Sequence, residues 1–295
     1  MPLVADGLIA AIVAFLGGAQ HLSPLEDVRA ELERAIERAG PDALLGLKAN
    51  LSADTGWDYY PRDLLAQRIH HMLADRFLAE GSAAVNVESL TSLDGAPVVI
   101  VANHLSYSDA NAIELLLQRA GASAVANRLT AVAGPKVFTS RERRFSSLCF
   151  GTIKVPQSAD VASGEAVLDA RQVARAARRA IDVAHQRLAA GDVLLLFPEG
   201  TRSRTAEMQP MLPAVARYLN APGIRIVPAG LTGSEALFPV DGGLRAARVT
   251  VRFGTAIQSD DLLAAHGRDH RAVMDALGHA VAALLPSSYR GVYAR

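Results

Sequence analysis

The stretch VVIVANHLSYSD, residues 98 to 109, joins an unbroken apolar run to a polar loop. An apolar run of this length, without alternation, is typical of a strand that is buried on both faces of a sheet. Three later runs have the same character: LTAVA at 129 to 133, VLLLF at 193 to 197 and IRIVPA at 224 to 229. Segments with helical periodicity separate the runs, at about 110 to 120, 139 to 149, 166 to 190 and 210 to 219. This alternation predicts strand-helix-strand units and a largely parallel sheet.

The residues outside this pattern predict further helices and one more strand. SPLEDVRAELERAIERAGP predicts a helix with Ser23 as N-cap, Pro24 at its first position and an end at Gly40-Pro41. A second helix is expected from about residue 61 to residue 81. ARVTVRF, at 247 to 253, predicts a strand, and a C-terminal helix is expected near 270 to 285.

We therefore expect an α/β fold with a mostly parallel mixed sheet flanked by helices and a small N-terminal helical domain. The expected boundary separates the helical domain, residues 1–85, from the α/β domain, residues 86–295. The apolar segment LIAAIVAFL, residues 8–16, is shorter than the roughly 20 apolar residues that a membrane span needs. A buried helix is the favoured interpretation of this segment, and a shallow interfacial anchor is the alternative.

Charge and cysteine content exclude several classes of protein. Thirty basic and thirty acidic residues give a formal net charge of zero, so binding to nucleic-acid phosphates is not expected. The single cysteine, Cys149, excludes an intramolecular disulfide framework and any zinc site with several cysteines. Since no His, Cys, Asp and Glu residues have ligand spacing, we expect no metal and no other cofactor. The cytoplasm is the predicted location.

The first candidate motif is NHLSYSD, residues 103 to 109, which follows the predicted strand at 98 to 102. Ligands of open α/β sheets bind beyond the carboxyl ends of the strands, so His104 is placed to meet a substrate. Asp109 can turn back against the imidazole, fix its tautomer and stabilise the imidazolium, which makes a general base. The alternative is that Asp109 only caps the next helix while His104 is a polar turn residue.

The second candidate motif is FPEGTRSR, residues 197 to 204, directly after another predicted strand. Gly200 permits close backbone approach, Thr201 offers a hydroxyl, and Arg202 offers a guanidinium, all suited to holding a phosphate or carboxylate. Glu199 is expected to orient an arginine or to accept a hydrogen bond from a substrate hydroxyl. The alternative is a polar loop with solvated arginines.

These two motifs resemble the first and third blocks of the glycerophospholipid acyltransferase family, which includes 1-acylglycerol-3-phosphate and glycerol-3-phosphate acyltransferases. AGPKVFTSRERRFSSLCFGTIKVP, at 133 to 156, is similar to the second block, and IVPAGL, at 226 to 231, to the fourth. The resemblance extends over roughly residues 85 to 255. Four blocks in the family's order are more specific than either motif alone.

The resemblance implies a catalytic base, His104, oriented by Asp109. It implies that the acceptor, through its phosphate or hydroxyls, contacts four residues of the third block and one of the second, namely Glu199, Gly200, Thr201, Arg202 and Lys136. Pro228 is expected to form a wall of the site. Members of the family commonly carry membrane-embedding N-terminal segments, which this chain replaces with a mostly amphipathic helical region.

The implied reaction moves a fatty acyl group from acyl-CoA or acyl carrier protein to a hydroxyl of 1-acylglycerol-3-phosphate. The alternatives are acylation of glycerol-3-phosphate, and a non-catalytic lipid-binding protein on the same fold. The expected partners are the acyl donor, a phosphorylated glycerol or lysophospholipid, and the inner membrane surface as a peripheral contact, with no nucleic acid.

Two other segments are interpreted as ordinary structure. His70 and His71 are adjacent on a predicted helix, so their rings are expected to point to different sides. GLTGSE, residues 230 to 235, lacks the spacing of the G-x-S-x-G nucleophile elbow, which argues against a serine hydrolase.

Overall fold

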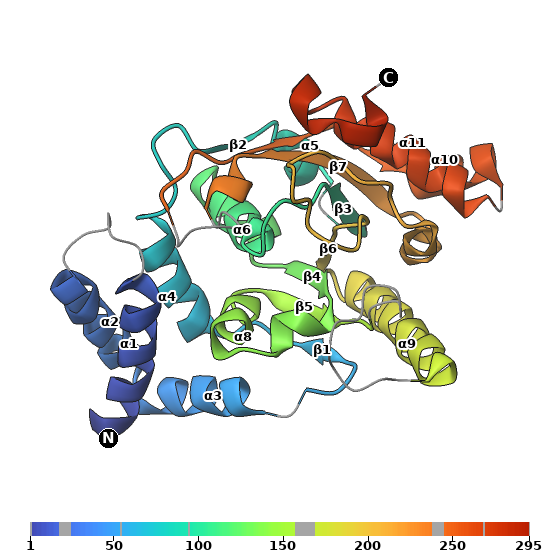
Figure 1. The fold of residues 1–295 in the computed structure, drawn as a ribbon. Coiled ribbons are helices and arrows are strands. Elements are labelled where there is room, and N and C mark those ends of the chain that lie inside the picture. Colours follow the sequence, from blue (N-terminus) through green and yellow to red (C-terminus); the bar gives the residue numbers. More distant parts are fainter. Residues whose placement is uncertain are drawn as a thin grey trace.

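One sheet of nine strands runs through the part of the chain that the computed structural model describes (Figure 1). That part comprises residues 2–17, 25–53, 55–93, 95–156, 169–237, 245–267 and 269–294. The strands are β1 Tyr59–Tyr60, β2 Ala83–Val85, β3 Val98–Ala102, β4 Leu129–Ala133, β5 Gly151–Lys154, β6 Val193–Leu196, β7 Arg225–Thr232, β8 Thr250–Phe253 and β9 Ile257–Gln258. Their order is β1-β5-β4-β6-β3-β7-β8-β2, and β9 pairs with β7.

The centre of the sheet is parallel and its margins are mixed. β3 pairs in parallel with β6 and β7, and β4 pairs in parallel with β6 and β5. β1, β8 and β9 each run antiparallel to their partners β5, β7 and β7. The predicted α/β fold with a mostly parallel mixed sheet is therefore confirmed. Because β3, β4 and β6 are parallel, the loops that follow them emerge at one edge of the sheet.

The central strands are buried on both faces, as their sequence predicts. Val98, Ile100 and Ala102 of β3 belong to one hydrophobic cluster, whereas Val99 and Val101 belong to the other. The first cluster includes the helices α1 Pro2–Gly17, α2 Leu25–Ala39, α3 Pro41–Ser52, α4 Leu64–Ala74 and α6 Asp109–Arg119. The second includes α9 Ala170–Ala189, α11 His270–Ala282 and the 3-10 helix η2 Pro213–Leu219. Figure 1 shows α1 to α4 beyond one side of the sheet and α9 to α11 on the other.

The N-terminal residues form helices, as predicted, and pack into the first cluster. Val28 and Leu32 of α2 are buried, and so are Ile9 and Ile12 of α1, the helix that contains residues 8–16. None of the helices in the described residues is both long enough and apolar enough to span a bilayer. The boundary after residue 85 stays a prediction.

The sequence predicts some helix limits incorrectly. α2 ends at Ala39, directly before Gly40-Pro41 as expected, but a further helix that was not expected, α3, begins at Pro41 after a turn at Gly40 with φ +83°. α4 starts after Asp63, whose side chain accepts hydrogen bonds from Leu65 N and Ala66 N, and it stops at Ala74, well before the expected residue 81. The cap assigned to Ser23 and Pro24 falls outside the described residues.

Other differences concern short elements. The helix expected at 139 to 149 is α8, Arg141–Ser147, and the one expected at 210 to 219 is η2, a 3-10 helix. The sequence does not predict β5, because GTIK contains too few apolar residues to indicate a buried strand. The remaining short elements are α5 Glu88–Thr91, α7 Ser123–Ala126, α10 Ser259–His266, η1 Pro135–Phe138, η3 Ser234–Ala236, η4 Ser287–Tyr289 and η5 Gly291–Tyr293.

The packing of α6 can be tested by shortening one leucine. Leu117 is fully buried, whereas Leu64 at the start of α4 is 65% exposed. We expect Leu117→Ala to lower the free energy of unfolding by about 3 kcal/mol, because it removes buried methyl groups and leaves a cavity. The matched Leu64→Ala change should cost less than about 0.5 kcal/mol. Urea unfolding measures both, and equal losses would contradict this packing.

Candidate active site

A histidine and a buried aspartate meet at the loop that follows β3. His104 Nδ1 lies 2.8 Å from Asp109 Oδ2, and the Asp109 side chain is completely buried. The strand ends at Ala102, and the chain then turns so that Asp109 becomes the first residue of α6. The two predicted candidates are therefore in direct contact.

Backbone N–H groups hold Asp109 in the loop. Leu105 N and Ser106 N donate to Asp109 Oδ2 at 2.6 and 2.9 Å. The hydroxyl of Ser234, which follows β7, donates to the other oxygen, Oδ1, at 2.6 Å. Asp109 Oδ2 also contacts His104 Nδ1, so when Nδ1 carries the proton that it donates to the carboxylate, Nε2 is the nitrogen left to accept one.

The imidazole of His104 lies against Phe197. The two rings stack with centroids 4.5 Å apart and an angle of 24°. Phe197 follows the last residue of β6, and β6 pairs directly with β3. Nε2 of His104 makes no hydrogen bond within the described residues, and the side chain is 19% exposed. This nitrogen is therefore able to take a proton from a bound molecule.

Glu199 joins the loop after β6 to the loop after β3. One of its oxygens accepts from His104 N at 2.8 Å, and the other accepts from Gln209 N at 2.7 Å. A third link is the hydrogen bond from Ser203 N to His104 O, 2.7 Å long. Burial raises the pKa of Glu199 to about 7, against the opposing effect of the two N–H donors. Both oxygens are engaged by backbone, so this geometry places Glu199 as a brace between the loops.

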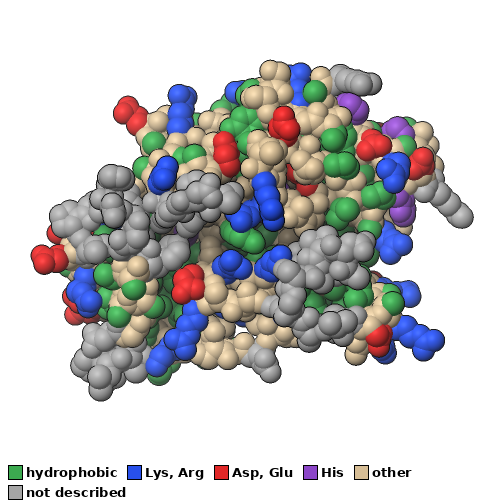
Figure 2. Space-filling view, viewed as in Figure 1, with side chains coloured by type: hydrophobic (Ala, Val, Ile, Leu, Met, Phe, Trp, Pro, Cys, Tyr) green, Lys and Arg blue, Asp and Glu red, His purple; other side chains and the backbone are tan. Residues whose placement is uncertain are grey.

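Two arginines flank Tyr107, which lies within the first motif. The guanidinium carbons of Arg202 and Arg143 are each 4.6 Å from the centroid of the Tyr107 ring. Neither guanidinium forms an ion pair with an acidic group of the described residues. Arg143 Nη1 also donates to the carbonyl of Lys136, on η1, at 3.3 Å. Figure 2 shows Lys and Arg side chains gathered around a hollow near the middle of the face, over the region of α6 and β4.

The remaining predicted residues occupy different places. Gly200 has φ +70°, a backbone conformation that favours glycine, and a Cβ at this position would displace the side chain of Leu212. Thr201 is exposed beside it. Pro228 is buried within β7, where it pairs with Val101 of β3. In the described residues, no group of three His, Cys, Asp or Glu side chains has the arrangement of a metal site.

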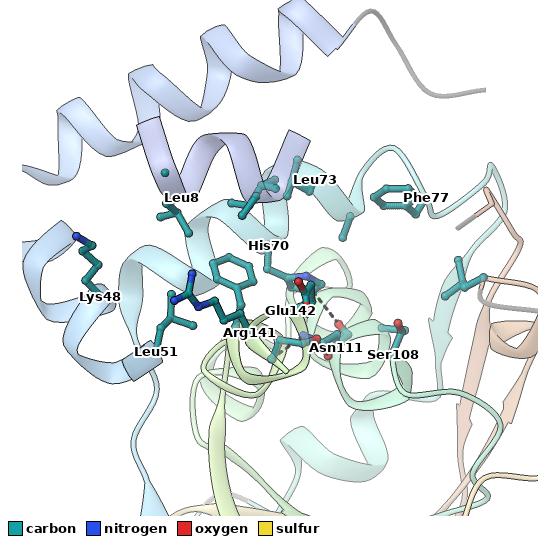
Figure 3. A pocket seen from close by; sticks show the side chains of 18 of the residues that line it. Leu8, Lys48, Leu51, His70, Leu73, Phe77, Ser108, Asn111, Arg141 and Glu142 are labelled. Atoms are coloured by element: carbon teal, nitrogen blue, oxygen red, sulfur yellow. Dashed lines mark hydrogen bonds between the residues drawn. The ribbon is translucent and has the colours of Figure 1, made fainter. Parts of the chain in front are cut away.

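A pocket of about 320 Å³ lies beside the start of α6. Its lining is mainly apolar and comes from α1, α3, α4, α6 and α8. It includes Leu8, Leu51, Leu73 and Phe77, together with Ser108, which directly precedes Asp109. Figure 3 shows these side chains converging from separate helices on one space. The sequence does not predict this pocket.

His70 and His71 depart from expectation, because both contact α6. His71 Nε2 lies 2.6 Å from Glu114 Oε2, and His70 Nε2 lies 3.4 Å from the carbonyl of Asn111, the contact drawn in Figure 3. α4 packs along α6, so neighbouring residues on α4 reach successive turns of α6. Burial lowers the pKa of His70 to about 4, so its ring is neutral at pH 7 where it lines the pocket.

Sequence reasoning missed Ser234, Arg143 and Tyr107. Tyr107 and Arg143 lie within segments that were singled out, and an aromatic residue with nearby arginines is a usable signal for cation–π contact. Ser234 lies in GLTGSE, considered only as a nucleophile elbow. No local pattern in that segment indicates that its hydroxyl reaches a carboxylate 125 residues away.

A histidine oriented by a carboxylate at the edge of a parallel sheet, with an arginine loop beside it, is an arrangement suited to general-base chemistry. A family model described as Acyltransferase matches residues 84–232, which is half of the chain, and the chain belongs to the acyltransferase family. The matched region contains His104, Asp109 and Arg202.

Comparison with solved structures gives a weaker likeness. The chain is similar to the crystal structure of the 1-acyl-sn-glycerophosphate (LPA) acyltransferase PlsC from Thermotoga maritima, with a TM-score of 0.47 and 16% sequence identity. The likeness covers 96% of this chain and 98% of that chain. No curated protein matches the chain significantly.

The raised pKa of Glu199 predicts a pH-dependent stability difference. With a folded pKa of about 7 against an ordinary 4.5, Glu199 holds more protons in the folded state, so its contribution to stability falls as pH rises between these values. Glu199→Gln does not titrate, and its amide N–H₂ opposes one backbone donor. We expect this variant to be less stable than the wild type at pH 4.5. The difference in their free energies of unfolding should shrink by about 3 kcal/mol by pH 8.

Urea unfolding of both proteins at a series of pH values measures this gap. The difference between the two curves isolates Glu199 from the other titrating groups. If the stability difference between the two proteins stays constant at every pH, the raised pKa of Glu199 is contradicted.

Proposed function

We propose that this acyltransferase moves a fatty acyl group from acyl-CoA or acyl carrier protein to a hydroxyl of 1-acylglycerol-3-phosphate. The observation that carries the proposal is the pair formed by His104 and buried Asp109, with Nε2 of the imidazole open to a substrate. Membership of the acyltransferase family supports acyl transfer as the reaction. The acceptor and the donor are the parts that need testing.

The proposed acyl transfer uses Nε2 of His104 as the proton acceptor. His104 Nε2 takes the proton of an acceptor hydroxyl while the hydroxyl oxygen attacks the thioester carbonyl of the donor. Asp109 accepts a hydrogen bond from Nδ1–H and stabilises the imidazolium that forms. When the carbon–sulfur bond breaks, the imidazolium returns the proton to the leaving thiolate. The products are the ester and the free thiol, and the base is regenerated without an acyl-enzyme intermediate.

The charge around the site supports an anionic acceptor. Arg202 and Arg143 both contact the ring of Tyr107, and neither is paired with an acidic group of the described residues. An acceptor phosphate bound near these guanidinium groups would accept charge-assisted hydrogen bonds from them. We assign the phosphate to these two guanidinium groups, with Lys136 and Thr201 nearby along the same loops and Gly200 allowing close approach.

The pocket supports a long acyl group. Its lining is mainly apolar and includes Ser108, the residue before Asp109, which suits the hydrocarbon chain of a long acyl group. Burial of each CH₂ group contributes about 0.8 kcal/mol, which favours long chains over acetyl. We place the protein in the cytoplasm, in peripheral contact with the inner membrane face where such acceptors reside.

The central test offers purified protein a radiolabelled long-chain acyl donor and two acceptors, 1-acylglycerol-3-phosphate and glycerol-3-phosphate. We expect the first to be acylated and acetyl-CoA to be a poor donor. His104→Ala should lower kcat at least about 100-fold, because it removes the general base. His266→Ala, at the end of α10, serves as a histidine control and should keep full activity.

Turnover of glycerol-3-phosphate alone would replace the proposed acceptor. No turnover with either acceptor, together with binding of lysophospholipid, would indicate a lipid-binding protein. Full activity of His104→Ala would overturn the mechanism.

The acceptor assignment predicts a selective change in KM. Arg202→Ala and Arg143→Ala should each raise the KM for the phosphorylated acceptor about tenfold or more, because each removes a charge-assisted contact. The KM for the acyl donor should stay within about twofold. Arg217→Ala removes an exposed arginine on η2 and should change neither constant.

Steady-state kinetics with each substrate varied in turn separates these effects. Equal changes in the two KM values would argue against phosphate binding by these arginines. Arg143→Lys adds a further check, since it keeps the charge but loses the planar stack on Tyr107.

A further inference from the structure

The two oxygens of Asp109 have very different surroundings. Oδ2 accepts three hydrogen bonds, from His104 Nδ1, Leu105 N and Ser106 N, all from its own loop. Oδ1 accepts only one within the described residues, from the hydroxyl of Ser234 at 2.6 Å. Asp109 and Ser234 are both completely buried, so water cannot replace this donor.

The corner that carries Ser234 is rigidly built. Gly233 has φ +86°, and a Cβ there would lie 2.0 Å from the carbonyl oxygen of Arg248, so this position requires glycine. Two residues earlier, Leu231 exchanges hydrogen bonds of 2.9 and 2.8 Å with the side chain of buried Asn103. Asn103 directly precedes His104. The corner is therefore fixed to the same loop that its serine supports.

A second anchor lies on the other side of Ser234. The hydroxyl of Tyr289, near the C-terminus, donates to Glu235 Oε1 at 2.6 Å. The C-terminal segment thus holds the residue that follows the serine. These contacts leave Ser234 little freedom to turn its hydroxyl away from Asp109.

We propose that Ser234 is a positioning residue, which fixes the plane and the charge of the Asp109 carboxylate and so sets the strength of His104 as a base. A carboxylate bound at both oxygens cannot rotate about its Cβ–Cγ bond. The serine hydrogen bond also draws negative charge toward Oδ1, away from the oxygen that faces the imidazole. This role rests on the proposed use of His104 as the base for acyl transfer.

Two other roles for the serine conflict with the geometry. A nucleophile needs an exposed oxygen beside a base, but the Ser234 hydroxyl is completely buried and donates to a carboxylate. Ser234 is not the cap of η3 either, because Gly233 occupies the N-cap position and Ser234 is the first residue of that helix. The serine side chain instead contacts the one residue that orients His104.

The titratable groups around the pair are few. Asp109 faces the imidazole from α6, and Glu199 accepts from the backbone of His104 in the loop after β6. Removal of the Ser234 hydroxyl leaves Oδ1 buried and unpaired, so more negative charge falls on Oδ2. The imidazolium is then held more strongly, and His104 should lose its proton at higher pH.

The first test does not depend on turnover. An NMR titration of the histidine ring nitrogens follows His104 in the wild type and in Ser234→Ala, with His104→Ala used to assign the signal. We expect the midpoint of the His104 titration to rise by about half a pH unit to one unit in Ser234→Ala. Ser259 is also completely buried, and its hydroxyl has no partner within the described residues, so Ser259→Ala is the matched control and should not move the midpoint.

The second test uses kinetics with the donor and the phosphorylated acceptor. Ser234→Ala should lower kcat about tenfold with both KM values within twofold, and the acid limb of the kcat profile should move upward with the NMR midpoint. Ser234→Thr keeps the hydroxyl and should restore most of the rate. Ser234→Cys, a weak donor of similar size, should fall between the two.

Each result supports or overturns the assignment. An unchanged midpoint in Ser234→Ala overturns it, and so does a loss of kcat that merely follows a loss of thermal stability. A shifted midpoint in a protein that acylates neither acceptor supports the role of Ser234 while the proposed function fails. If the midpoint does not shift and the enzyme is active, the proposed function stands and only the positioning role of Ser234 is overturned.

Discussion

The active-site region depends on one buried carboxylate, Asp109. A polar group buried in an apolar interior needs hydrogen-bond partners, and the fold supplies four donors to Asp109: two backbone N–H groups, the imidazole and the Ser234 hydroxyl. Three come from the loop after β3 and the fourth from the corner after β7. The carboxylate therefore holds two neighbouring strand ends together while it fixes the tautomer of His104.

Glu199 does the same for a different pair of loops, and the contrast between the two acids is informative. Asp109 accepts a hydrogen bond from the imidazole itself, whereas Glu199 accepts only from backbone N–H groups, at His104 and Gln209. Burial raises the pKa of Glu199 to about 7, so the link that Glu199 makes between the loops is sensitive to pH near neutrality. Asp109 thus contacts the ring of His104, and Glu199 contacts the backbone of the same residue.

The loop that carries His104 lies near two arginines and also near a mainly apolar pocket. Arg202 and Arg143 both contact Tyr107, which lies three residues after His104, and neither forms an ion pair among the residues that the structure describes. Beside the start of α6 lies an apolar pocket whose one imidazole, His70, is neutral because burial lowers its pKa to about 4.

The sequence by itself determined the elements whose signal is local. Apolar runs report burial on both faces, so β3, β4, β6 and β7 and the mostly parallel sheet were predictable, and the motif around His104 and Asp109 was visible in consecutive residues. Tertiary structure alone decided what depends on pairing between distant segments. β5 is a strand because β4 and β1 pair with it, and the pocket exists because helices from separate parts of the chain leave space between them. Ser234 reaches Asp109 across 125 residues, because β7 lies next to β3 and strand order is not written in local periodicity.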